Sequence, residues 1–118
     1  MSNYDKAKAV VAALEEASPQ LLALLAESGE LPRKIQDRVS RFNLAFVRRM
    51  ERQPENRELE IEESLLPLLL EFPQSQDQRP LNPAQKQAVE NALDQWADSQ
   101  PPSEVSPSLA NLLAETSA

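Results

Sequence analysis

The chain has 118 residues and a net charge of −7, which suits one acidic domain with a modest core. It has no cysteine and no histidine, so disulfides, thiolate or imidazole metal ligands and the usual histidine base are excluded. Its single glycine removes glycine-rich phosphate loops and argues against a sheet-rich fold with many tight turns.

Two helices are predicted at the start of the chain, over residues 4–16 and 19–28. The first is rich in alanine, a strong helix former. The second begins with the pair Ser18-Pro19, a cap followed by proline at the first helical position, and ends before Gly29. Almost no loop joins them, so we expect either a bent continuous helix or a tight corner.

The longest helical pattern covers residues 32–53, between Pro32 and Pro54. Its apolar residues recur at steps of four, three, four and four: Ile35, Val39, Phe42, Phe46 and Met50. This spacing places one apolar stripe along a helix. We expect the other helices to pack on that stripe.

An acidic segment with five glutamates follows over residues 54–63, and its pattern allows either an extended piece or a helix. A short apolar helix is then predicted over residues 65–72, with Ser64 as its cap and Pro67 in its first turn. The glutamates lack the spacing of a calcium loop, so a solvated or arginine-paired role is favoured over metal or hydrolytic chemistry.

The cap-proline pair Asn82-Pro83, with Gln85 at the capping-box position, predicts a helix over residues 83–98. Residues 100–118 read as a proline linker followed by a short amphipathic helix. Its leucines could dock on a partner or on the chain's own body: Leu109, Leu112 and Leu113.

The predicted architecture is all-α, a small bundle of five to six helices around the long helix over about 32–53. Residues 1–99 should form the helical domain, and residues 100–118 the linker and last helix. The expected core residues are mostly aliphatic: Leu14, Leu21, Leu25, Ile35, Val39, Phe42, Phe46, Met50, Leu66, Leu69, Val89 and Trp96.

The long helix also carries the clearest charge asymmetry. Residues 31–53 hold seven basic and two acidic residues, whereas the remainder has a net charge of −12. Six of the bases fall on one flank: Lys34, Arg38, Arg41, Arg48, Arg49 and Arg52. This flank could select an acidic partner protein or follow phosphates on a nucleic acid. Alternatively, it is paired with the chain's own acidic segment or simply solvated.

The apolar segment 65–72 is the second candidate surface. Its residues are numerous enough to cover nearly every face of a short helix, so one side could meet a partner or a second copy: Leu65, Leu66, Leu69, Leu70 and Phe72. Alternatively, the segment is a core helix that is buried within the protein itself.

We therefore expect a non-enzymatic protein–protein interaction module, such as an adaptor, assembly factor or regulator, with a homodimer plausible. No cofactor or metal is expected. Nucleic-acid binding through the basic flank is the alternative hypothesis. The N-terminus has no apolar signal core and no apolar run approaches the ~18 residues that span a bilayer, which favours a cytoplasmic protein without membrane contact.

Overall fold

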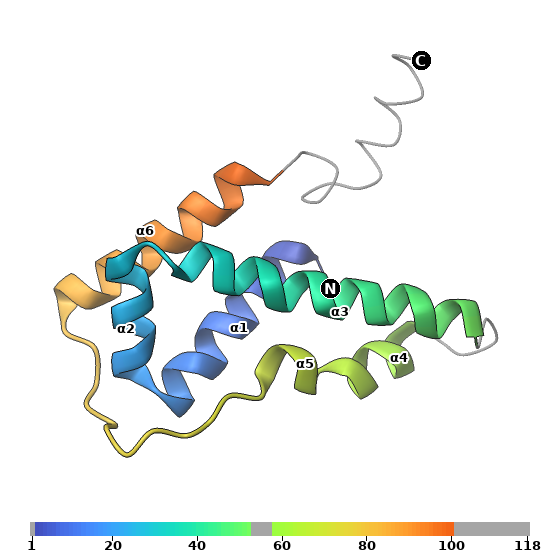
Figure 1. The fold of residues 1–118 in the computed structure, drawn as a ribbon, viewed down its shortest axis with the longest axis horizontal. Helices are drawn as coiled ribbons and strands as arrows, with labels where there is room; N and C mark the ends of the chain where they lie inside the picture. Colours follow the sequence, from blue (N-terminus) through green and yellow to red (C-terminus); the bar gives the residue numbers. More distant parts are fainter. Residues whose placement is uncertain (1, 53–57, 101–118) are drawn as a thin grey trace, which may run out of the picture.

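A computed structural model describes residues 2–52 and 58–100, and it confirms the predicted all-α class (Figure 1). The helices in chain order are α1 (Asn3–Ala17), α2 (Pro19–Ser28), α3 (Leu31–Arg52), α4 (Glu58–Leu65), α5 (Pro67–Leu70) and α6 (Pro83–Ser99). The predicted docking helix with Leu109, Leu112 and Leu113 lies outside the described residues. In the described part of the chain, no helix is long and apolar enough to cross a membrane.

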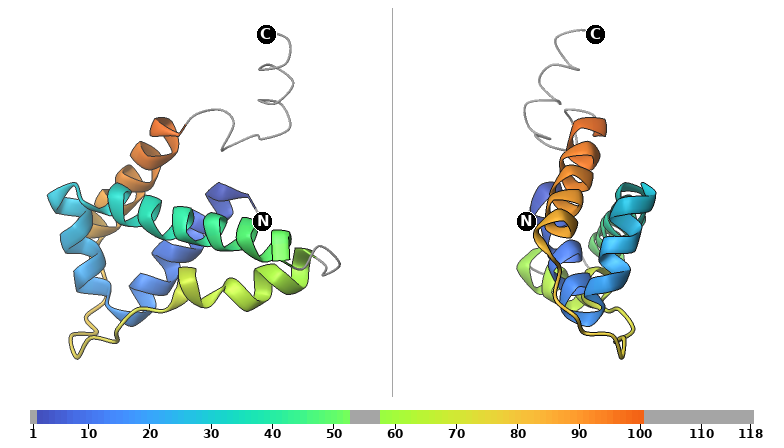
Figure 2. Two further views of the ribbon diagram at one scale, coloured as in Figure 1. Left: turned by 45° about the vertical axis from the view of Figure 1, so that its right-hand side comes forward. Right: turned by 90° about the vertical axis from the view of Figure 1, so that its left-hand side faces the viewer.

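The long helix α3 is the central element, as its apolar stripe predicts. Leu31, Ile35, Val39 and Phe42 are buried along one side of it. Figures 1 and 2 place α2 and α6 at the N-terminal end of α3, α4 and α5 alongside its C-terminal part, and α1 between them. Burial is nevertheless uneven, because the buried residues of α3 end at Phe42, and Phe46 and Met50 in its C-terminal part are only partly buried.

A tight corner joins α1 to α2, which decides between the two expected connections. Ser18 has an extended backbone with φ −160°, and its N–H donates to the Leu14 carbonyl at 2.7 Å. Proline at position 19 cannot donate a backbone hydrogen bond, so the helix ends there and restarts in a new direction. Gly29 closes α2 with φ +80°, a left-handed conformation that other residues adopt only with strain.

The helix predicted over residues 65–72 has different boundaries in the structure. Helix α4 already begins at Glu58, so the described part of the acidic segment is helical and not extended. Ser64 lies inside α4 and donates to the Ile61 carbonyl instead of capping a helix. The break falls at Pro67, because its nitrogen cannot donate to the Glu63 carbonyl and that carbonyl accepts from Leu66 at 3.4 Å. Phe72 follows the end of α5.

Most predicted core residues are buried or pack against the core. Leu14, Ile35, Val39, Phe42, Leu69, Val89 and Trp96 are buried, and Leu25, Phe46, Met50 and Leu66 are partly buried against them. The prediction for Leu21 was wrong, because 44% of this residue is exposed and Leu22 is buried in its place. Four leucines in ten residues of α2 leave its inner face undefined by periodicity alone.

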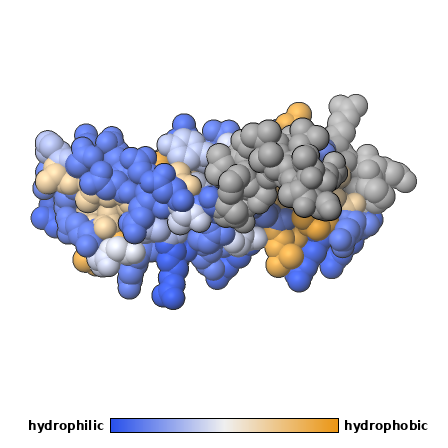
Figure 3. Space-filling view, turned by 90° about the horizontal axis from the view of Figure 1, so that it is seen from above, coloured by the Kyte–Doolittle hydropathy of each residue, from blue (hydrophilic) through white to orange (hydrophobic). Residues whose placement is uncertain are grey.

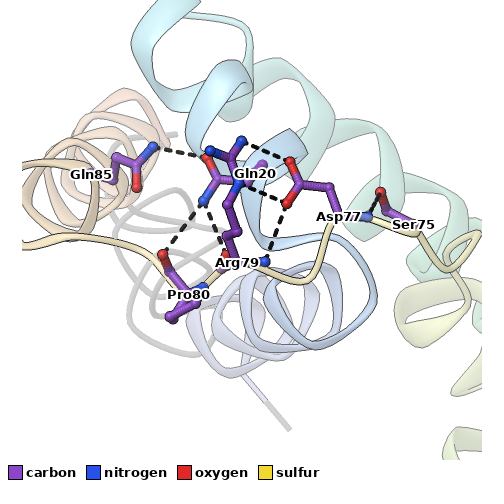
Figure 4. A network of polar contacts seen from close by, with 6 residues as sticks. All are labelled: Gln20, Ser75, Asp77, Arg79, Pro80 and Gln85. Atoms are coloured by element: carbon purple, nitrogen blue, oxygen red, sulfur yellow. Dashed lines mark hydrogen bonds and ion pairs between the residues drawn. The ribbon is translucent and has the colours of Figure 1, made fainter.

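The loop between α5 and α6 is held against the bundle by side-chain hydrogen bonds (Figure 4). The Arg79 guanidinium contacts the Asp77 carboxylate through two bonds of 2.9 Å. The Gln20 side chain donates to the Arg79 carbonyl at 3.0 Å and accepts from Gln85 at 3.0 Å. These bonds tie the loop to α2 and to the first turn of α6.

Helix α6 begins with the predicted capping box. The Asn82 side chain accepts from the Gln85 backbone, and the Gln85 side chain accepts from the Asn82 backbone. Trp96 is buried near the other end, and its indole N–H donates to the Gln36 side chain of α3 at 3.0 Å. This bond fixes where the end of α6 lies along α3.

Candidate functional site

The apolar segment 65–72 contributes more to the core than to the surface. Leu65 and Leu69 are buried, and Leu66 and Phe72 are partly buried against the core. Only Leu70 is strongly exposed, at 40%. The five leucine and phenylalanine side chains predicted to meet a partner therefore do not form one continuous exposed face.

Leu70 and Phe72 instead border a hollow against α1, which we call the alanine groove. Its volume is about 580 Å³, and its walls come from α1 and from the residues around the end of α5: Ala9, Ala12, Ala13, Glu16, Ala17, Leu70, Phe72 and Gln74. Glu16 and Gln74 are its two polar side chains, and it has no basic residue to bind an acidic ligand.

The predicted basic flank is divided among three places. Lys34 lines a hollow between α2 and α3, beside two acidic residues, Glu30 and Asp37. Arg38 is engaged within the fold: its guanidinium donates to the Leu68 carbonyl at 3.0 Å and lies 4.2 Å from the Phe72 ring centroid. The Leu68 carbonyl belongs to the last turn of α5, so Arg38 caps that helix and is not free to recruit a partner.

The remaining arginines converge on a second hollow, which we call the basic groove. It lies between the C-terminal part of α3 and the α4–α5 pair, with a volume of about 440 Å³. Four arginines and four apolar residues line it: Arg41, Arg48, Arg49, Arg52, Leu44, Ala45, Leu65 and Leu68. Its length along α3 from residue 41 to 52 is roughly 16 Å at about 1.5 Å per residue.

Helical periodicity explains how the basic groove forms. Positions 41, 45, 48 and 52 are three or four residues apart and so lie on one side of α3. The apolar stripe next to this side anchors α4 and α5 through the buried residues Ile61, Leu65 and Leu69. The arginines therefore line the boundary between α3 and the α4–α5 pair.

Few of the positive charges in the basic groove are paired with a carboxylate in the part of the chain that the structure describes. Arg41 contacts Asp37 at 3.3 Å, an exposed pair one helical turn apart. Within residues 2–52 and 58–100, Arg48, Arg49 and Arg52 form no ion pair, and neither do Glu58, Glu60 and Glu63 of α4. The expectation that the acidic segment neutralises these three arginines is not met by its described residues.

Exposed aliphatic side chains accompany these arginines. Leu44 lies in the basic groove and Val47 lies on the same helix, and each is 52% exposed. Seen from above in Figure 3, hydrophobic patches interrupt a mostly hydrophilic face. The sequence prediction did not include Leu44, Ala45 and Leu68 as site residues. The spacing of Leu44 and Ala45 from Arg41 and Arg48 could have identified those two, whereas Leu68 reaches the groove only through the packing of α5.

A buried lysine of α1 forms a separate polar cluster between α1 and α3. Lys6 is only 9% exposed, and its ammonium donates to the Asn43 side chain at 2.7 Å and to Asn3 at 3.3 Å. It also lies 4.9 Å from the Phe42 ring centroid. Burial lowers the pKa of Lys6, and the nearby carboxylate of Glu62 opposes part of that shift. The cluster borders none of the hollows described above, so we assign it to the fold.

No protein-family model, curated protein or solved structure matches the chain. In the part of the chain that the structure describes, no group of three or more acidic, histidine or cysteine residues is placed to hold a metal ion. We therefore infer function from the residues and geometry of the basic groove.

Proposed function

We propose that this chain is a non-enzymatic protein-binding module whose basic groove holds an acidic amphipathic segment of another protein. The observation that carries the proposal is a set of arginines that form no ion pair with the described residues and that stand above an aliphatic floor, which includes the exposed Leu44. A small adaptor or regulator of an acidic partner would need this combination of features.

The lining of the basic groove suits a helix with leucines on one face and carboxylates beside them. The floor of Leu44, Ala45, Leu65 and Leu68 supports burial of aliphatic side chains from the partner. Arginine guanidinium groups bind carboxylates through two parallel hydrogen bonds, which adds orientation as well as affinity. Among residues 2–52 and 58–100, three of the four arginines have no ion pair that would have to break before binding.

A nucleic acid is the less favoured ligand for the same arginines. The basic groove contains no aromatic side chain on which a base could stack. Outside residues 31–53 the chain has a net charge of −12, which repels a long polyanion. A phosphate backbone also has no apolar group that could cover the aliphatic floor of the groove.

A second copy of this chain is also disfavoured as the occupant. A symmetric dimer through the basic groove would bring two sets of four arginines together, and like charges across an interface oppose association. A homodimer through residues 65–72 would have to use Leu70 and the alanine groove, because Leu65 and Leu69 are buried within one protomer.

Fluorescence anisotropy with a labelled helical peptide of glutamates and leucines tests the proposal. We expect saturable binding to the full chain that weakens with added salt. The variant Arg48→Glu/Arg52→Glu should bind roughly tenfold or more weakly, because two attractive charges become repulsive. The control Arg33→Glu/Lys34→Glu reverses two basic charges of α3 outside the basic groove, so it changes the net charge by the same amount and should have a smaller effect.

Two results would contradict the proposal. Equal losses in the Arg33→Glu/Lys34→Glu and Arg48→Glu/Arg52→Glu variants would mean that net charge alone, and not the groove, attracts the peptide. Binding of a labelled single-stranded oligonucleotide in preference to the peptide would assign the arginines to nucleic acid.

A further inference from the structure

The basic groove has a candidate ligand within the same chain. We infer that residues 107–115 dock in the basic groove of their own molecule and compete there with the acidic partner. This inference rests on the groove that the proposed function uses, and it names how access to that groove is regulated.

The sequence of residues 101–118 matches the lining of the groove. It contains two glutamates, Glu104 and Glu115, and no lysine or arginine. Leu109, Leu112 and Leu113 are spaced three and four residues apart, so in a helix they share one face. Residues 107–115 therefore combine an apolar face with one carboxylate, Glu115, and Glu104 lies in the connecting chain; this composition complements four arginines around an aliphatic floor.

The distance to be crossed is within reach of the connecting chain. The hydrogen bond between Trp96 and Gln36 fixes the end of α6 beside α3, five residues before the groove begins at Arg41. From Gln36 to Arg48 the path along α3 is roughly 18 Å at about 1.5 Å per residue. The nine residues from Gln100 to Leu109 extend up to roughly 30 Å. That length also covers a detour around a helix about 10 Å wide.

The direction of α6 supports the same path. In Figure 1 and in the left view of Figure 2, α6 runs in the direction of the C-terminal part of α3 and ends on the opposite side of α3 from α4 and α5, so the connecting chain has to pass around α3. A tethered segment of weak affinity is then held near the groove at a high effective concentration. A separate partner must displace the tethered segment, so the tail should raise the partner concentration that is needed to fill the groove.

Disulfide trapping tests the inference in the full chain, which has no native cysteine. Ala45→Cys places a thiol in the groove, and Thr116→Cys places one on the leucine face of the tail without removing a leucine. The matched control pairs Thr116→Cys with Ser40→Cys, an exposed position of α3 nearer to the start of the tether. Random encounters should therefore favour the control.

We expect the Ala45→Cys/Thr116→Cys protein to form an intramolecular disulfide roughly tenfold or more faster than the control at low micromolar concentration. Adding Arg48→Glu or Leu112→Glu should remove that advantage. Equal rates in the two proteins, or a covalent dimer as the main product, would overturn the inference. Because no partner is present, a negative result would leave peptide binding by the groove unaffected, and a positive one would not depend on it.

Discussion

The ammonium group of Lys6 loses hydration by being buried, and its contacts inside the fold offset part of that loss. Its ammonium has hydrogen bonds to Asn43 and Asn3, the face of Phe42 beside it and the charge of Glu62 nearby. Even so, loss of hydration is the largest influence on this group and lowers its pKa from the ordinary value of 10.5. The folded chain therefore binds this proton less tightly than the unfolded chain does.

This shift predicts a specific pH dependence. At pH values between the lowered pKa of Lys6 in the folded chain and 10.5 in the unfolded chain, the unfolded chain binds more protons than the folded chain. The contribution of Lys6 to the free energy of unfolding should therefore rise with pH in that range. We expect the free energy of unfolding of the native chain, relative to Lys6→Met, to increase as the pH rises through the lowered pKa of Lys6 toward 10.5. Thermal unfolding followed by circular dichroism at several pH values measures it. A difference that stays constant with pH would refute the assignment.

Arg38 gives a second prediction at the scale of one residue. Arg38→Met keeps the aliphatic stem but removes the bond to the Leu68 carbonyl and the contact with Phe72. We expect a loss of about 1–2 kcal/mol in urea unfolding. Arg41→Met removes only an exposed pair with Asp37 and should cost under about 0.5 kcal/mol. Equal costs for the two variants would show that Arg38 does not cap α5.

Helix α5 shows how much one element can differ between adjacent residues. Leu69 is completely buried, whereas Leu70 is 40% exposed. Leu69→Ala should cost about 2–4 kcal/mol, because it leaves a cavity in the core. Leu70→Ala should cost under about 1 kcal/mol. Urea unfolding followed by the fluorescence of Trp96, the one tryptophan, compares them. A larger loss of unfolding free energy for Leu70→Ala than for Leu69→Ala would mean that Leu70, and not Leu69, is the buried residue.

The elements that were predictable are those with a single unambiguous pattern. The stripe of α3, the capping box of α6 and the cap-proline start of α2 each follow from local sequence, and each is present. The boundaries over residues 58–72 were not predictable in the same way. Pro67 does lie in the first turn of a helix, α5, as predicted, but a second helix, α4, precedes it, and Ile61 and Leu65 of α4 are buried in the core.

On the scale of the whole molecule, uneven coverage of α3 creates the candidate site. The basic flank could be read from the sequence, because it needs only the helical period. Its division among three places could not, because that depends on where α2, α4 and α5 pack. Arg38 and Arg41 are one turn apart on α3, yet Arg38 caps α5 and Arg41 lines the basic groove.

The most direct test of the central claim is a nuclear magnetic resonance titration of the isotope-labelled full chain with the acidic glutamate–leucine peptide. The basic groove predicts that the largest amide shift changes fall between Arg41 and Arg52 and at Leu65 and Leu68, with little change in α2. The largest changes at the alanine groove or around Leu21, or none at saturating peptide, would contradict the account.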